Sequence, residues 1–218
     1  MKIKIEILYK TSKGTETTFL SDEMNPEKAL LLAEDLERTG RVKNMIFYDN
    51  HDTTLMLKEL RKYVSSVEDE PHNIVVFFDG GFDVETKNSG LGCVIYYEQG
   101  GKQLRVRKNA RIEELNTNGE AEYAALHLAI SELEFMGVHH IPVTFTGDSQ
   151  GVINQLNDEW PCYEEELLRW IDRIEHKIDE LGITPEYTLV PRKRNREADH
   201  LATQALNGVE IFSNSEIE

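Results

Sequence analysis

Four carboxylates in this sequence of 218 residues could together bind divalent metal ions. Asp79 and Asp148 each follow an apolar run that predicts a strand. Glu122 falls on a predicted helix, and Asp199 opens another. Carboxylate oxygens are preferred ligands of Mg²⁺ and Mn²⁺, and a pair of such ions can activate water and neutralise charge on a phosphate. The four acids therefore indicate metal-dependent phosphodiester chemistry.

Glycines next to two of these acids are expected to shape the chain. We expect the pair Gly80-Gly81 to end a strand and turn the chain, so that Asp79 projects from a strand end. Gly147 precedes Asp148 and permits a tight approach of the backbone. Two adjacent strands would then present two facing acids.

The elements around the acids predict an α/β fold. From residue 73 onward we expect strands at 74–78, 91–98, 103–110, 141–145 and 187–190, and helices at 118–136, 149–157, 163–181 and 196–206. Short glycine-bearing links make the first three strands antiparallel. Helices that alternate with the later strands imply a mixed five-stranded sheet with helices on both faces.

The first 64 residues predict a separate small α+β domain, in which Asn25 caps a helix over 26–38. The apolar stripe of that helix is expected to consist of Ala29, Leu32, Ala33 and Leu36. Further elements are expected as strands at 2–9, 15–20 and 42–48 and a helix at 54–63. Residues 65–72 are polar and predict a linker, residues 73–208 form the main domain, and residues 209–218 form an acidic tail.

Four motifs surround the acids. They are Phe78-Asp79-Gly80-Gly81, Thr117-Asn118-Gly119-Glu120-Ala121-Glu122-Tyr123, Thr146-Gly147-Asp148-Ser149-Gln150 and Asn195-Arg196-Glu197-Ala198-Asp199-His200-Leu201-Ala202. Each motif alone is weak, but their content and order resemble ribonuclease H in its type 1 or reverse-transcriptase-like branch. The order of the predicted elements is also that of the ribonuclease H fold.

The resemblance implies a reaction and a cofactor. Members of the family cut the RNA strand of RNA/DNA hybrids inside the strand, with two Mg²⁺ or Mn²⁺ ions, and leave 5′-phosphate and 3′-hydroxyl ends. By resemblance, Asp79 would bridge both ions, Asp148 would bind the ion on the leaving-group side and Asp199 the ion on the water side. Glu122 would contact metal and the 2′-hydroxyl by which a protein tells RNA from DNA.

Substrate contacts are carried over in the same way. The positions that match the family are Gly80, Asn118 and Gln150, and the basic turn before the last acid adds Arg192, Lys193, Arg194 and Asn195. Cations close to an acidic metal site have little folding rationale, whereas a phosphate beside that site would require them. The turn lacks the histidine that many relatives carry there, and His200 is expected at the surface instead.

Glu120 competes with Glu122 for the helical role, because both lie near the start of the same predicted helix. The family places its acid five residues after the threonine, which selects Glu122. Side chains two residues apart on a helix also point about 200° apart. Glu120 is then a helix-start acid that the helix dipole favours.

Composition limits how the protein meets nucleic acid. The chain has 24 basic and 40 acidic residues and a net charge of -16, which argues against binding through a whole-protein positive field. Local clusters must make the phosphate contacts: the turn 192–196, or the cations of the predicted hairpin at Lys102, Arg105, Arg107, Lys108 and Arg111. For the hairpin, a solvated surface is an equal alternative. No stretch predicts a membrane span or a signal peptide, so we expect a cytoplasmic protein.

Alternatives remain for the role of the first domain and for the activity of the second. The first domain matches a small hybrid-binding domain in element order only, and residues 1–70 hold 11 basic against 14 acidic residues, so a protein partner is slightly favoured over hybrid binding. The alternative to an active enzyme is a nucleic-acid-binding or scaffold module that kept the fold and lost activity. A 3′ to 5′ exonuclease ranks low, because those enzymes begin with Asp-x-Glu and position 81 is glycine. The oligomeric state is not predicted.

Overall fold

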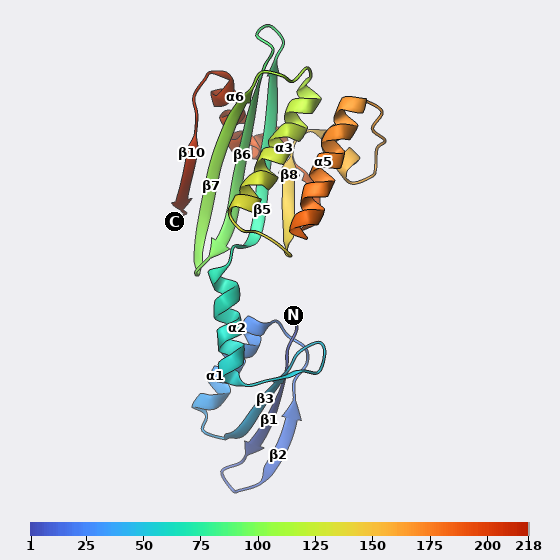
Figure 1. Cartoon of the computed structure of the whole chain (residues 1–218). Coiled ribbons are helices and arrows are strands. Elements are labelled where there is room, and N and C mark those ends of the chain that lie inside the picture. The colour runs from blue at the N-terminus through green and yellow to red at the C-terminus, as the bar shows by residue number, and fades with distance from the viewer. Residues whose placement is uncertain (218) are drawn as a thin grey trace. The chain divides into compact units, whose positions relative to one another are not determined.

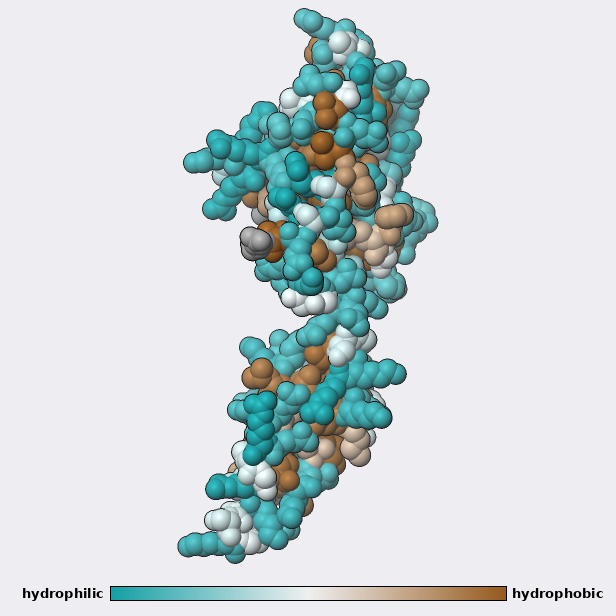
Figure 2. Space-filling model, turned by 90° about the vertical axis from the view of Figure 1, so that its left-hand side faces the viewer, coloured by the Kyte–Doolittle hydropathy of each residue, from teal (hydrophilic) through white to brown (hydrophobic). Residues whose placement is uncertain are grey.

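The computed structural model describes residues 1–217 and divides into two compact units, Met1–Asp69 and Glu70–Glu218. Each unit has its own buried core. Figure 2 shows one face of the molecule, where hydrophilic residues predominate and apolar residues form small separate groups. Within residues 1–217, no helix combines the length and the apolar character needed to cross a membrane.

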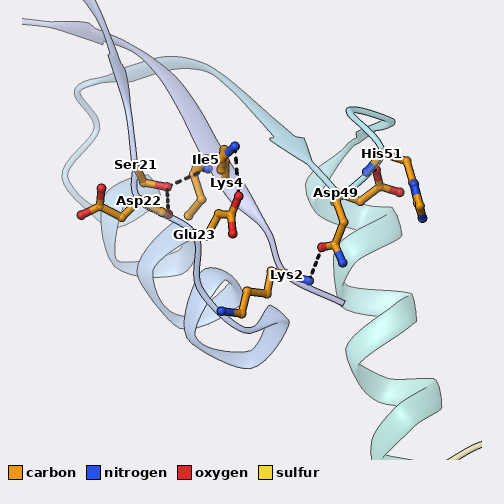
Figure 3. A network of polar contacts seen from close by, with 9 residues as sticks. Lys2, Lys4, Ile5, Ser21, Asp22, Glu23, Asp49 and His51 are labelled. Carbon is orange, nitrogen blue, oxygen red and sulfur yellow. Dashed lines mark hydrogen bonds and ion pairs between the residues drawn. The ribbon is translucent and has the colours of Figure 1, made fainter.

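The first unit is a four-stranded antiparallel sheet with two helices on one face. Its elements are β1 (Lys4–Lys10), β2 (Glu16–Leu20), α1 (Pro26–Arg38), β3 (Val42–Tyr48), β4 (Thr54–Leu55) and α2 (Leu57–Asp69), and the strand order is β2-β1-β3-β4. The core between sheet and helices contains Ile5 and Phe47 from the strands and Ala29, Leu60 and Val64 from the helices. Figure 3 shows one strand end, where the Ser21 hydroxyl accepts from the Ile5 amide and donates to the Asp22 carbonyl, both at 2.8 Å.

Both helices of this unit differ in part from the prediction. In α1, Asn25 caps the helix as expected, but Leu32 is 39% exposed. Leu30 packs against the core in its place, because the buried side of the helix is centred on Ala29 and Ala33. The helix expected at 54–63 instead spans 57–69, so most of the predicted linker is helical. Val64 extends the buried side of the helix past residue 63.

The second unit is built on a six-stranded mixed sheet (Figure 1). Its strand order is β10-β7-β6-β5-β8-β9, with β5 parallel to β8 and β8 parallel to β9. The strands are β5 (His72–Asp83), β6 (Asn88–Gln99), β7 (Lys102–Ile112), β8 (Pro142–Gly147), β9 (Thr184–Leu189) and β10 (Phe212–Glu216), and the helices are α3 (Asn118–Phe135), α4 (Gln150–Leu156), α5 (Glu165–Leu181) and α6 (Arg196–Leu206). The predicted mixed sheet with helices on both faces is confirmed, with α3 and α5 on one face and α6 on the other (Figure 1).

The sixth strand comes from the predicted acidic tail. Residues 212–216 pair antiparallel with 104–108 of β7, and Glu216 forms an ion pair with Lys102 at 2.7 Å. Asn109 anchors the chain before the strand, since its side-chain oxygen accepts from the Ile211 amide at 2.7 Å. The tail lacks the apolar alternation of a strand, so this pairing depends on backbone partners far away in the sequence.

Gly80 and Gly81 do not turn the chain, contrary to the prediction. Strand β5 continues through both glycines to Asp83, and the hairpin closes where the Lys87 amide donates to the Asp83 carbonyl at 2.9 Å. A Cβ atom on Gly80 would lie 2.1 Å from the carbonyl carbon of Ala121 in α3. Glycine is therefore required for the close approach of helix and strand, and Asp79 projects from within a strand.

Candidate functional site

The four acids line a single cavity of about 270 Å³. They come from four elements: Asp79 from β5, Glu122 from the start of α3, Asp148 from the residue after β8, and Asp199 from the first turn of α6. The complete lining is Asp79, Gly80, Gly81, Asn118, Glu122, Asp148, Ser149, Arg192, Asp199, Ala202, Thr203 and Leu206. Asp79 and Glu122 are only 8% and 6% exposed, so part of the cavity wall is a buried pair of carboxyl groups.

Asp79 and Glu122 come together because α3 packs directly on β5. The Gly80 amide donates to Oε2 of Glu122 at 3.3 Å, which ties the helical side chain to the strand. This bond needs the short distance between backbones that only glycine at position 80 allows. The same glycine thus contributes to both the packing and the placement of one acid.

Asp148 is held by two features of the neighbouring chain. A Cβ on Gly147 would lie 2.9 Å from the ring of Phe78, so glycine lets the end of β8 approach β5. Nδ2 of Asn195 then donates to Oδ1 of Asp148 at 2.7 Å and to the Phe78 carbonyl at 2.9 Å. The end of β8 and the start of α6 are therefore joined at the residue that precedes Asp79.

Asp199 is paired with a cation. Nη2 of Arg192 donates to Oδ1 of Asp199 at 2.5 Å, and the arginine side chain is mostly exposed. Helix α6 lies close on the sheet because Gly90 and Gly92 leave room: a Cβ on either glycine would lie 2.3 Å or less from a carbonyl oxygen of the helix. Two glycines of β6 thus let α6 lie close to the sheet, which brings Asp199 near Asp79.

The cavity disfavours the charged form of its two most buried carboxyl groups. Burial, together with the charges of Asp148 and Asp199, raises the pKa of Asp79 to about 8. Burial and the charges of Asp79 and Asp148 raise the pKa of Glu122 to about 8 as well. Arg192 opposes both shifts. The buried carboxyls therefore hold protons near neutral pH unless a cation compensates their charge.

The donor set fits a hard divalent cation, because it consists of carboxylate oxygens in a polar cavity that destabilises its own negative charge. Among residues 1–217, no three His, Cys, Asp or Glu side chains stand close enough to hold one ion together. Two of these side chains are bonded elsewhere, Asp199 to Arg192 and Asp148 to Asn195. Binding an ion requires rotations of these side chains.

Glu120 and Glu122 have different surroundings. Oε2 of Glu120 accepts from the Asn116 amide at 2.9 Å, and the Thr117 hydroxyl accepts from the Glu120 amide at 3.1 Å. This arrangement resembles a capping box, with Glu120 reaching the amide one residue before the N-cap Thr117. The structure therefore places Glu122 in the cavity and uses Glu120 to begin the helix.

The predicted substrate contacts fall into three groups. Gly80, Asn118 and Arg192 line the cavity. Gln150, Lys193 and Arg194 are exposed and do not line it. Asn195 is only 1% exposed and bonds within the protein, which does not fit the expectation of a substrate contact.

Ser149 and one side of α6 also form part of the wall, and neither was among the predicted site residues. Ala202, Thr203 and Leu206 line the cavity together with Asp199. Their signal was present in the sequence, since residues three, four and seven positions after an acid share its side of a helix. His200 lies off that side and is exposed, as predicted.

The cations of the hairpin have partners inside the protein. Arg105 and Arg107 both form ion pairs with Glu197 of α6 at 3.0 Å, and the Tyr96 hydroxyl donates to the same carboxylate at 2.6 Å. Lys108 forms an ion pair with the buried Glu132 at 2.6 Å. These contacts join the sheet to α6 and α3, so the hairpin cluster serves packing, and the turn before α6 is the cationic segment at the cavity.

The chain is similar to known proteins in sequence and in fold. Residues 77–205 match the family described as reverse transcriptase-like. The uncharacterized protein YpeP of Bacillus subtilis (strain 168) is 40% identical over 205 residues, which cover 94% of this chain and 90% of that protein. The crystal structure of RNase H1 from Halobacterium salinarum NRC-1 is similar, with a TM-score of 0.55 and 29% identity over 62% of this chain and 98% of that one. LC11-RNase H1 in complex with an RNA/DNA hybrid gives a TM-score of 0.56 and 28% identity, with 62% and 98% covered.

Proposed function

Because the chain belongs to the reverse transcriptase-like family and has a ribonuclease H-like fold, we propose that it is a metal-dependent endoribonuclease that cuts the RNA strand of RNA/DNA hybrids. The observation that carries this proposal is the single cavity lined by Asp79, Glu122, Asp148 and Asp199. The hybrid in the LC11-RNase H1 complex supports the choice of substrate. Cleavage leaves a 5′-phosphate and a 3′-hydroxyl.

Two Mg²⁺ or Mn²⁺ ions are the proposed cofactors, with the four acids as their ligands. When bound, they supply a more acidic water and stabilise charge on the phosphate oxygens. The raised pKa values of Asp79 and Glu122 support this assignment, because a cation would relieve the repulsion that causes part of each shift.

The other residues of the site hold and orient the substrate. Asn118 and the backbone at Gly80 line the cavity and are proposed to contact the RNA strand, with Glu122 near its 2′-hydroxyl. Lys193 and Arg194 are exposed on the turn before α6 and are proposed to bind backbone phosphates. Arg192 lines the cavity and forms its ion pair with Asp199.

Cleavage assays on the full-length protein test the proposal. Protein with Mg²⁺ or Mn²⁺ is incubated with an internally labelled RNA/DNA hybrid, and in parallel with RNA duplex, DNA duplex and single strands. We expect internal cuts in the RNA of the hybrid alone. Shortening from the 3′ end would indicate an exonuclease, and binding without cleavage would indicate the scaffold alternative.

Asp79→Asn is the decisive variant, and Asp83→Asn is its matched control on the same strand. Asp83 lies at the hairpin turn, where its side chain accepts from the amides of Glu85 and Thr86 and does not reach the cavity. Loss of a metal ligand should lower turnover by on the order of 10³-fold, because the metal stabilises the transition state by several kcal/mol. Asp79→Asn should fold normally, as judged by circular dichroism. Full activity of a folded Asp79→Asn protein contradicts the assignment.

A further inference from the structure

Asn195 lies between the basic turn and α6, and its side chain contacts Phe78 of β5 and Asp148, two residues beside the acidic cavity. Its side chain is 1% exposed, and Nδ2 is 2.9 Å from the Phe78 carbonyl and 2.7 Å from Oδ1 of Asp148. Both partners are acceptors, so the orientation of the amide follows from chemistry: the reverse orientation would place Oδ1 against two oxygens. The two N–H groups of the amide are thus fully used inside the protein.

Asparagine at the start of a helix usually caps it, and Asn195 does not. Its side chain makes no capping bond to α6 and points back to the sheet. Its backbone carbonyl still accepts the helical bond from the Asp199 amide at 3.1 Å. The local helix therefore does not explain why this side chain is an amide.

These bonds connect Asn195 to three of the four acids. It binds Asp148 directly, it binds the carbonyl of the residue before Asp79, and its backbone begins the turn that carries Asp199. We propose that Asn195 is a positioning residue that fixes one oxygen of Asp148 relative to Asp79 and Asp199 and leaves the other oxygen for metal. This inference rests on the proposed function, and it assigns Asn195 to orientation of a metal ligand in place of contact with substrate.

Metal affinity separates these roles. Mn²⁺ binding is measured by electron paramagnetic resonance of the free ion for wild type, Asn195→Ala and the control Asn207→Ala. Asn207 is exposed at the other end of α6 and donates only to the Thr203 carbonyl, at 3.0 Å. Partners that orient a metal ligand typically contribute about 10- to 100-fold in affinity, so Asn195→Ala should lose that much and Asn207→Ala should match wild type.

Kinetics and proton exchange provide the other readouts. For Asn195→Ala, kcat on a hybrid should fall while KM stays within about twofold, because an orienting residue acts on the transition state. In wild type, nuclear magnetic resonance should show the Asn195 side-chain amide protons exchanging far more slowly than those of Asn207. This last measurement needs no variant, so it tests the two amide bonds on which the inference depends even where Asn195→Ala does not fold.

Specific outcomes overturn the inference. Unchanged Mn²⁺ affinity in a folded Asn195→Ala protein overturns it, as does a raised KM with unchanged kcat, or fast exchange of the wild-type amide. Failure of the proposed function gives a different result, in which wild type binds Mn²⁺ and does not cut hybrids. In that case, a loss of affinity in Asn195→Ala still supports the positioning role.

Discussion

Replacing Gly80 by alanine should force α3 away from β5. The added Cβ would lie 2.1 Å from the carbonyl carbon and 2.2 Å from the carbonyl oxygen of Ala121, and 2.4 Å from the Glu122 nitrogen. Ordinary contacts begin near 3.4 Å, so the helix must retreat by roughly 1 Å. All three clashing atoms belong to the helix backbone, and no rotation of a side chain can relieve the clash.

The expected cost follows from this geometry. Overpacking of this kind lowers the free energy of unfolding by about 1–3 kcal/mol, and a backbone clash puts Gly80→Ala at the upper end. The same retreat moves Glu122 away from Asp79 and lengthens the bond from the Gly80 amide to Glu122. A misplacement of about 1 Å in a catalytic group can cost about a hundredfold in rate.

Gly81→Ala is the matched control. Its Cβ would meet only the tip of the Leu206 side chain, at 3.3 Å, which can rotate. Urea denaturation gives the free energy of unfolding of both variants, and hybrid cleavage gives kcat. If Gly80→Ala is as stable and as active as Gly81→Ala, the close approach of α3 does not set the site, and the reasoning is refuted.

Two further predictions concern the carboxyls. The pKa values of Asp79 and Glu122 rise from ordinary values of 3.8 and 4.5 to about 8 in the folded protein. The folded state therefore binds these protons more tightly than the unfolded state. Their contribution to the free energy of unfolding is complete below about pH 4 and is lost as the pH rises through about 8. Urea denaturation with a chelator should show the free energy of unfolding falling between pH 5 and pH 8 in wild type and falling less in Asp79→Asn; equal slopes would contradict the shift. Glu120→Ala should remove the capping box, lower the free energy of unfolding by about 1 kcal/mol and keep most of the cleavage activity. A loss of activity as large as that of Glu122→Ala would assign Glu120 to the site instead.

Local patterns in the sequence determined much of the fold. The helices predicted at 196–206 and 118–136 begin where α6 and α3 begin in the structure, at Arg196 and Asn118. These features depend on contacts within a few residues, which is why a sequence alone can specify them. The order of strands and helices, together with four motifs around the acids, was enough to predict the family and the mixed sheet.

Contacts between distant segments decided the rest. The sequence predicts a turn at Gly80, but in the structure this position is a packing contact. Only glycine fits there, because a Cβ atom would clash with the backbone of Ala121 in α3. Residues 212–216 become a strand only because the edge of β7 offers backbone partners. The residue types at the site came from the sequence, whereas their common cavity, the raised pKa of Asp79 and the two bonds of Asn195 came from the tertiary structure. Burial and charge repulsion depend on distances in space, and spacing along the chain does not fix those distances.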